Sequence, residues 1–462
     1  MTDQNTRTES DSLGEVHLPA DALYGAQTQR AVDNFPISGR RMHEGFVRAL
    51  LMLKRAAAQV NEGLDCIDGD KAAAISAAVS QLLDDGALMT HFPVDVYQTG
   101  SGTSTNMNAN EVIAHVANTI NAGASVHPND HVNFGQSSND VIPSSIHLSL
   151  AIAIERELLP ALQSLMATIN RKAKALSGIT KTGRTHLMDA MPVRFDQILG
   201  GWNEQLKLAE SRLQGMLAEV KTIALGGTAV GTGVNTHPDF AQAVAAKLAK
   251  ELGLEIEAAS NPFPLMGSQD TVVAASGQLK ALAVSIMKIS NDLRWMNSGP
   301  LAGLGEIVLP ALQPGSSIMP GKVNPVIPEA ATMVCARVMG NDVALAVAGQ
   351  SGNFELNVML PLVADTVLES TTLLTGAMQV LAEKAIDGFE VNHGQIEDRL
   401  GRNPILVTAL NPIIGYSKAA QIAKKAYATG APIIDVAADE TDLSREELEK
   451  LLDPAKLTAG GL

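Results

Sequence analysis

The segment Gly315–Pro325, GSSIMPGKVNP, carries a concentrated set of groups that could hold a negative charge. Two hydroxyls, Ser316 and Ser317, precede Lys322 and Asn324. Glycine and proline recur so closely here that neither a helix nor a strand can continue, so we expect a loop. A loop can bring hydroxyls, an ammonium group, an amide and backbone N–H groups towards one point. These groups suit a carboxylate whose charge grows during a reaction.

Two further segments are dense in uncharged polar residues. Gln98–Glu111 reads QTGSGTSTNMNANE, and a helix N-cap would account for only one or two of its polar groups. Gly135–Pro143 reads GQSSNDVIP, in which Ser137 or Ser138 could cap a helix. The first N–H groups and the dipole of that helix would then favour an anion.

A lone histidine is more often structural than catalytic, and His186 in GRTHLMDAMP has to be weighed on that basis. Its neighbours Arg184 and Thr185 are polar, and we expect Pro192 to open a long helix. His127 and His131 have metal-ligand spacing, but Pro128 and the lack of a third ligand argue against a metal. The glycine-rich run at residues 226–233 could suggest a dinucleotide site, yet no strand is expected before it and no βαβ pattern around it.

The composition excludes several classes of protein. A chain of 462 residues with 46% hydrophobic and 18% charged residues is globular, and two or three domains are expected. Aromatic residues make up only 3%, which favours close-packed helices over a β-sandwich. The net charge of -15 argues against a nucleic-acid partner, and an anionic substrate would need local positive charge at its site.

Cysteine usage and hydropathy indicate where the protein works. Cys66 and Cys335 are too few for an iron–sulfur cluster and form no disulfide framework, which fits a reducing cytoplasm. The polar N-terminal stretch lacks the apolar core of a signal peptide. We find no strongly apolar, uncharged window of about 20 residues, so no membrane span is expected.

Long helical patterns dominate the middle of the chain, and most are apolar on nearly every face. Five of them in one monomer could hardly bury one another, so we expect them to pack against other copies of the chain. Pro160 should kink the first. An all-helical bundle with perpendicular packing is the alternative architecture. The expected helices are 140–175, 192–221, 270–297, 328–349 and 362–385.

We expect four segments along the chain. Residues 1–12 form a polar disordered tail, residues 13–136 a mixed helical domain, residues 137–395 the central bundle and residues 396–462 a small C-terminal helical domain. Shorter helices are expected at 44–61 and 71–84 in the second segment. The last should hold short helices at 417–429, 434–439 and 444–452.

Taken together, these motifs resemble the fumarase/aspartase superfamily, over almost the whole chain from Gly25–Arg30 to Asn411–Ala419. The first loop matches the family pattern GSSxMPxKxNP, and GRTHLMDA matches G[RK][ST]HxQDA except that Met188 replaces a glutamine. GGTAVGTG resembles a family turn near the site. QTGSGT and NFELN are similar to the class II, iron-independent fumarases more than to aspartases.

The resemblance implies a role for individual residues. Ser316 would act as the base, Lys322 would bind the substrate carboxylate together with Asn324, and His186 paired with Glu329 would handle the water or hydroxyl. Substrate would also contact Ser101, Thr103, Ser137, Ser138, Asn139, Thr185 and Ser317, with Asn106 and Asn108 nearby. A secondary anion site would involve His127, Asn129 and Asp130, weakened because Ala124 stands where an arginine is common.

For the whole protein, the resemblance implies a mainly α, three-domain fumarase/aspartase-like fold whose long helical bundle assembles into a multi-helix tetramer core. It implies reversible hydration of fumarate to (S)-malate, a step of the tricarboxylic acid cycle, through an aci-carboxylate. No metal or other cofactor is implied. The homotetramer would share each site between subunits. Aspartate ammonia-lyase is the main alternative; argininosuccinate or adenylosuccinate lyase and a recruited, non-enzymatic structural protein are others.

Overall fold

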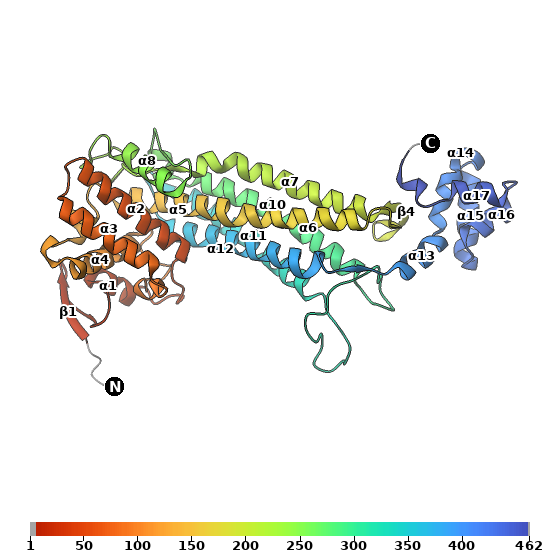
Figure 1. The fold of residues 1–462 in the computed structure, drawn as a ribbon, viewed down its shortest axis with the longest axis horizontal. Coiled ribbons are helices and arrows are strands. Elements are labelled where there is room, and N and C mark those ends of the chain that lie inside the picture. Colours follow the sequence, from red (N-terminus) through yellow and green to blue (C-terminus); the bar gives the residue numbers. More distant parts are fainter. Residues whose placement is uncertain (1–5, 461–462) are drawn as a thin grey trace. The chain divides into compact units, whose positions relative to one another are not determined.

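The computed structural model describes residues 6–460, which are mostly helical (Figure 1). The chain divides into two compact units, each made of separate stretches. Unit 1 takes in the described residues through Pro160, then Ser211–Ala283 and Ala336–Thr375. Unit 2 takes in Ala161–Glu210, Val284–Cys335 and the described residues from Gly376 onwards. The expected segment boundaries near residues 136 and 395 remain predictions.

Long helices supply part of both units. They are α6 (Leu159–Ala175), α7 (Phe195–Val220), α10 (Asp270–Met296), α11 (Val326–Gln350) and α12 (Leu360–Leu381), which continues into η5 (Ala382–Ile386). Polar contacts join neighbours among them within each unit. In unit 1, Ser276 of α10 donates to Asp342 of α11 at 2.8 Å. In unit 2, Trp202 of α7 donates to Asp292 of α10 at 3.2 Å, and the two helices run side by side in Figure 1.

The remainder of unit 1 consists of short strands and medium helices. α2 buries one apolar face and packs against α3, α5 and α8. The elements are β1 (Thr6–Asp11), β2 (Gly14–Pro19), α1 (Ala26–Asn34), α2 (Glu44–Gly63), α3 (Gly69–Asp84), η1 (Leu88–His91), α4 (Thr103–Ile120), η2 (Ala122–Ala124), η3 (Pro128–Val132), α5 (Ser138–Ala153), η4 (Ile154–Leu158), β5 (Thr222–Ile223), α8 (Phe240–Leu252), β6 (Glu257–Ala258), α9 (Phe263–Gly267), β8 (Gly352–Asn353) and β9 (Leu356–Asn357).

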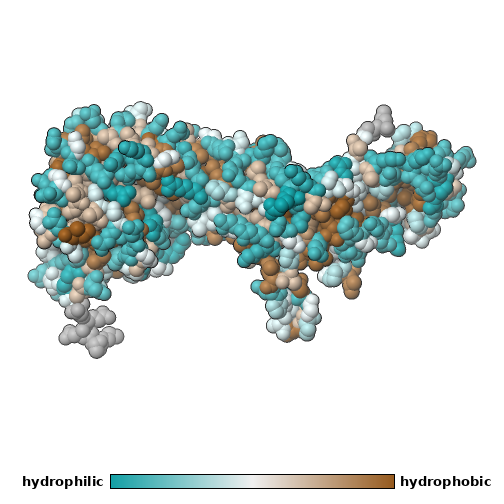
Figure 2. Space-filling view, viewed as in Figure 1, coloured by the Kyte–Doolittle hydropathy of each residue, from teal (hydrophilic) through white to brown (hydrophobic). Residues whose placement is uncertain are grey.

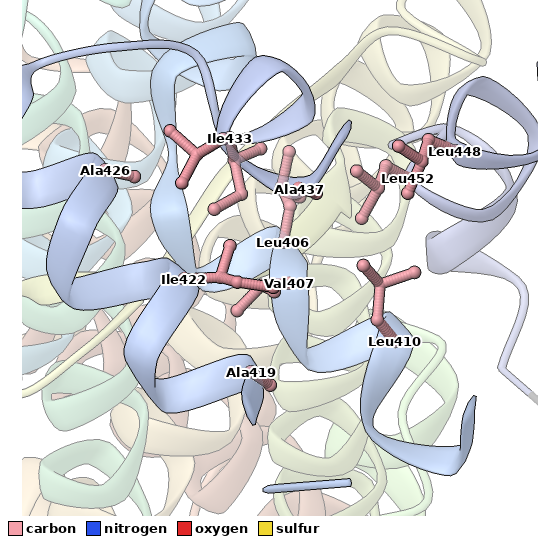
Figure 3. Close-up of a cluster of buried hydrophobic side chains, with 11 residues drawn as sticks. Leu406, Val407, Leu410, Ala419, Ile422, Ala426, Ile433, Ala437, Leu448 and Leu452 are labelled. Carbon is pink, nitrogen blue, oxygen red and sulfur yellow. The ribbon is translucent and has the colours of Figure 1, made fainter. Parts of the chain in front are cut away.

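Unit 2 adds a hairpin and the C-terminal helices. Eleven buried residues of these helices form a hydrophobic core of their own, which includes Leu406, Ile422 and Leu448 (Figure 3). The elements are β3 (Thr180–Thr185), β4 (Met188–Arg194), β7 (Ile307–Val308), β10 (Glu390–Val391), α13 (His393–Arg402), η6 (Pro404–Leu410), α14 (Asn411–Ile414), α15 (Tyr416–Thr429), α16 (Ile433–Glu440), α17 (Arg445–Leu451) and η7 (Lys456–Thr458).

Two local expectations are corrected by these elements. Residues 6–11, expected in a disordered tail, form β1, which pairs with β2; residues 1–5 of that tail lie outside the described residues. Pro192 lies in β4, and the long helix begins only at Phe195. The strand at β4 was not expected because Pro192 lies within it, and proline is uncommon inside strands.

The first long helix runs from Ser138 to Ala175, close to the expected range 140–175, but its hydrogen-bond pattern changes before Pro160. Residues Ile154–Leu158 form a π-helical turn, in which the N–H of Leu159 donates to the carbonyl of Ile154. Proline lacks an N–H and crowds the preceding turn, so the wider turn accommodates it without ending the helix.

Two helices are apolar and long enough to cross a membrane by length and composition alone, α10 and α11. The expectation that no such segment exists was therefore too strict. The core helices of soluble proteins pass the same test, and both helices make polar contacts with neighbouring helices. We interpret them as bundle helices.

Candidate active site

The loop at Gly315–Pro325 closes on itself by two hydrogen bonds. The N–H of Gly315 donates to the carbonyl of Lys322 at 2.8 Å, and the Asn324 side-chain amide donates to the carbonyl of Gly315 at 2.6 Å. A Cβ at Gly315 would lie 2.2 Å from the Lys322 oxygen, so only glycine permits this approach. The loop therefore holds Ser316, Lys322 and Asn324 in one small closed segment.

Ser316 is positioned as an acceptor of backbone hydrogen bonds. Its hydroxyl oxygen accepts from the N–H of Ile318 at 3.3 Å and from the N–H of Met319 at 3.1 Å. Such donors stabilise an alkoxide more than a neutral hydroxyl, because they point partial positive charge at the oxygen. The adjacent Ser317 is exposed. The local geometry thus distinguishes the two serines.

One cavity of about 820 Å³ in unit 2 brings together three of the expected residues. Lys322, Asn324 and Glu329 line it, with Arg294 and Trp295 of α10. Arg294 was not singled out from the sequence, because an isolated arginine near a helix end usually serves the surface or the helix dipole. Two cations and one carboxylate therefore line this cavity, which suits a small anionic ligand.

His186 occupies the turn of the β3–β4 hairpin. His186 and Leu187 have φ of 54° and 62°, so both turn residues are left-handed, as in a two-residue type I′ turn. Such turns usually contain asparagine or glycine, and each side-chain-bearing residue there is strained by roughly 1–2 kcal/mol. Strain of this kind is found preferentially at functional sites. The turn leaves Thr185 and His186 exposed.

The hairpin is anchored by a buried charge cluster. Glu306 forms ion pairs with Lys181 at 3.1 Å and with Arg184, and the three side chains are 3–15% exposed. Burial lowers the pKa of Lys181, and the neighbouring Glu306 opposes that effect. Because Arg184 lies two residues before His186, this cluster fixes the strand that presents the histidine.

Unit 1 gathers the remaining substrate-binding candidates around the start of two helices. The hydroxyls of Ser101 and Thr103 lie 2.8 Å apart at the start of α4. Ser137 caps α5 in a reciprocal capping box with Asp140, so Ser137, and not Ser138, is the cap. Asn139 donates to the carbonyl of Ala229 at 2.8 Å.

Asn106 and Asn108, although close in sequence, point to different places. Asn106 donates to the hydroxyl of Ser138 at 3.0 Å and so joins the two polar segments. Asn108 is fully buried and donates to the carbonyl of His91 at 2.9 Å. Only the first belongs to the polar cluster around Ser138.

The glycine-rich turn at residues 226–233 is tied to this cluster by Asp140. One carboxylate oxygen of Asp140 accepts the N–H groups of Gly226 and Thr228, each at 2.9 Å. Burial raises the pKa of Asp140 to about 6, against the backbone hydrogen bonds, which lower it. Contrary to expectation, a two-residue strand precedes the turn, and β5 and β6 are parallel with α8 between them. The carboxylate nevertheless occupies the N–H groups that a phosphate would need.

His127 and Asn129 line a second cavity, of about 460 Å³, together with the carboxylate-bearing Glu9, Asp11 and Glu111. His127 also lies 3.2 Å from the carboxylate of Asp130. Neighbouring carboxylates disfavour an anion. A secondary anion site at His127, Asn129 and Asp130 remains a prediction that this geometry does not strengthen.

The expected catalytic and substrate-binding residues therefore fall into three groups: the unit 1 cluster, the His186 turn, and the Ser316 loop with Glu329 at the start of α11. Within unit 2, no hydrogen bond or ion pair among the described residues joins His186 to Glu329, Ser316 or Lys322. The expected His186–Glu329 pair is thus not formed within one copy of the chain.

The chain is similar to known lyases over its whole length. Residues 14–340 match the family described as Lyase, and residues 406–459 match the family described as Fumarase C C-terminus. Fumarate hydratase class II 2 of Pseudomonas aeruginosa is 63% identical over 100% of both chains. Fumarate hydratase class II of Xylella fastidiosa is 56% identical over 99% of this chain and 96% of the relative.

Solved structures agree in fold. The class II fumarase of Schistosoma mansoni has a TM-score of 0.94 and 35% identity, covering 98% of this chain and 99% of its own. A Brucella melitensis protein described as fumarate lyase:delta crystallin has a TM-score of 0.92 and 42% identity, covering 98% and 99%. The fold and the sequence together show that the chain belongs to the class II fumarases of the fumarase/aspartase superfamily.

Proposed function

We propose that this hydro-lyase converts fumarate and water to (S)-malate and back, with Ser316 as the base that removes the proton from malate. The observation that carries the proposal is the pair of backbone N–H groups on the Ser316 oxygen, within a loop that also supplies Lys322 and Asn324. Full-length identity of 63% with a fumarate hydratase class II supports the same reaction.

The difficult step is removal of a proton from the carbon beside a carboxylate, since it leaves an aci-carboxylate with one more negative charge. The site must bind this species more tightly than it binds malate. Lys322 and Asn324 provide a cation and an amide for it, and backbone N–H groups of the loop can add to them. Ser316 first gives its hydroxyl proton to water, the N–H donors of Ile318 and Met319 stabilise the resulting alkoxide, and the alkoxide then takes the proton from malate.

The second half of the reaction removes the hydroxyl group. We infer that His186, supported by Glu329 and acting through a water, protonates the leaving hydroxyl and activates water in the opposite direction. Thr185 and Ser317 contact substrate, and the polar cluster of unit 1 binds a carboxylate. That cluster consists of Ser101, Thr103, Ser137, Ser138 and Asn139.

We infer that the complete site forms only when several subunits meet in a homotetramer. The support is that one copy of the chain leaves His186 unpaired with Glu329 and leaves large apolar side chains on bundle helices exposed. Met333 is 68% exposed and Val343 65% exposed, both on α11. Brown apolar patches interrupt the hydrophilic face in Figure 2. Exposure on this scale is typical of surfaces that other subunits cover.

A direct assay tests the reaction. The ultraviolet absorbance of fumarate is followed after malate or aspartate is added to separate samples of the purified protein. We expect absorbance to rise with malate alone. A rise with aspartate alone would instead support an aspartate ammonia-lyase, which the similar proteins do not favour. No rise in either sample would favour a structural role.

We infer that the reaction takes place in the cytoplasm, because Cys66 and Cys335 are free thiols, which fits a reducing compartment.

The serine assignment needs a matched pair of variants. Ser316→Ala should lower kcat by at least about 100-fold, because the base is removed. Ser317→Ala should mainly raise KM. Equal kcat for Ser316→Ala and the unaltered enzyme would remove Ser316 from the role of base.

A further inference from the structure

Lys54 of α2 is a fully buried lysine to which the proposed mechanism gives no role. Its ammonium donates to the side-chain oxygen of Asn133 at 2.8 Å. Among residues 6–460, no ion pair joins Lys54 to a carboxylate. Burial lowers the pKa of Lys54 to about 7. A buried cation that donates to a neutral amide, and that forms no ion pair among the described residues, costs stability.

The carboxylate that acts electrostatically on Lys54 is Asp140, and it is already occupied. Asp140 accepts backbone N–H groups from Ser137, Gly226 and Thr228, each at 2.9 Å. These donors satisfy its charge without Lys54. With a pKa of about 7, Lys54 is only partly protonated near neutral pH, and a second anion bound nearby would favour its charged form.

A short chain of hydrogen bonds connects Lys54 with the polar cluster. The Asn133 oxygen that accepts from Lys54 also accepts from the Asn106 amide at 3.2 Å. The same amide donates to the hydroxyl oxygen of Ser138 at 3.0 Å. Because that oxygen is used as an acceptor here, the O–H of Ser138 can be directed at an anion. Ser138 is half-buried at the first turn of α5, where backbone N–H groups also favour an anion.

We propose that Lys54 is a positioning residue whose buried ammonium group supplies positive charge to the carboxylate-binding cluster formed by Ser137, Ser138 and Asn139. It acts through Asn133 and Asn106 and does not touch the substrate. The three residues of the cluster carry only hydroxyl and amide groups, and the whole chain has a net charge of -15. A dicarboxylate thus gains at this point the cation that these three residues lack. The inference rests on the proposed role of this cluster in substrate binding.

The test compares two substitutions in the full-length assembled enzyme. Lys54→Met removes the charge and the hydrogen bond, and Lys54→Gln removes the charge but keeps an N–H donor. In both variants we expect the KM for malate and the inhibition constant of succinate to rise about tenfold. We expect kcat to stay within about threefold, because Ser316 and His186 are unaltered. The melting temperature should stay equal or rise, since a buried cation is removed.

Lys247→Met on α8 is the matched control, because it removes one lysine charge from a partly exposed position of the same unit, where the ammonium lies 3.7 Å from Glu251. Its KM should equal that of the unaltered enzyme. Unchanged KM and succinate inhibition in a folded Lys54→Gln protein would overturn the proposal, as would a fall in kcat with unchanged KM. The Gln variant decides the question if the Met variant does not fold.

A separate variant distinguishes this inference from the function on which it rests. Ser138→Ala should raise the KM for malate if the cluster binds a substrate carboxylate. A normal KM in Ser138→Ala would refute the cluster itself. A raised KM in Ser138→Ala with a normal KM in Lys54→Gln would refute only the role of Lys54.

Discussion

Arg184 donates to the carboxylate of Glu306, a fully buried partner that lies 122 residues later in the chain. The contact ties the strand that ends just before His186 to the segment that follows α10. Lys181 reaches the same carboxylate from the same strand. The position of His186, the proposed acid–base residue, thus depends on one buried acid that has no chemical part in the proposed reaction.

Glu306→Gln should destabilise unit 2 and lower activity. The substitution leaves Lys181 and Arg184 buried without their counter-charge, which typically costs about 3–5 kcal/mol. Urea unfolding measures the loss, and kcat should fall because the His186 hairpin is less firmly held. Glu383→Gln, at an exposed position of the same unit, should change neither. Equal urea midpoints for Glu306→Gln and the unaltered protein would contradict this role.

Leu187→Gly should make the protein more stable. Leu187 is exposed and has a φ of 62°, a conformation that glycine adopts without strain. We expect a gain of about 1 kcal/mol in the free energy of unfolding, measured with urea. Leu208→Gly, at an exposed helical position of α7, should instead lose about 1 kcal/mol. A loss in both variants would show that the turn is not strained.

Gly315→Ala should lower activity with little effect on stability. The added Cβ would collide with the carbonyl of Lys322 and break the Gly315–Lys322 hydrogen bond that closes the loop. A displacement of about 1 Å in a catalytic group can cost roughly 100-fold in kcat. Steady-state kinetics and thermal melting measure the two effects. Gly394→Ala, which has open space around its Cβ position, should leave kcat unchanged. Normal turnover in Gly315→Ala would mean that catalysis does not need the loop to be closed at Gly315.

His147 should make the protein sensitive to acid. It is buried, its ring lies 2.7 Å from the carbonyl of Thr222, and burial lowers its pKa from 6.5 to about 4. Between these two values the unfolded chain binds more protons than the folded one, so stability falls as the pH falls from 6.5 to 4. The full loss is about 3 kcal/mol.

His147→Gln should flatten that dependence, measured as urea midpoints at several values of pH. Asp140 acts in the opposite direction, because burial raises its pKa from 3.8 to about 6 and the folded state holds the extra proton. Its contribution is fully present below pH 3.8 and is lost as the pH rises through about 6. The difference between the unaltered protein and His147→Gln isolates the histidine. Parallel curves for the two would show that His147 is not the acid-sensitive group.

The sequence was a good guide wherever one signal dominated. The long apolar patterns predicted α10, α11 and α12 within a few residues, and the class II fumarase motifs predicted the family. The loop at Gly315–Pro325 was expected from its glycines and prolines, and the structure shows it closed by the Gly315 and Asn324 hydrogen bonds.

What the sequence did not reveal depends on contacts between distant residues. The β3–β4 hairpin was missed because its turn, His186–Leu187, contains neither asparagine nor glycine. Glu306 and Lys54 look like ordinary charged residues in sequence, since burial and partners decide their importance. The expected approach of His186 to the Ser316 loop between copies of the chain stays a prediction.

The C-terminal helices have their own buried core (Figure 3), so this segment should behave as an exchangeable cassette. A chimera carrying the equivalent segment of another fumarase would need to keep the two side-chain hydrogen bonds between this segment and strand β4 of the His186 hairpin. Asn403 donates to the carbonyl of Ala190, and Arg194 donates to the hydroxyl of Thr458. Exchanges that keep these two hydrogen bonds should change the surface of the C-terminal segment without moving His186.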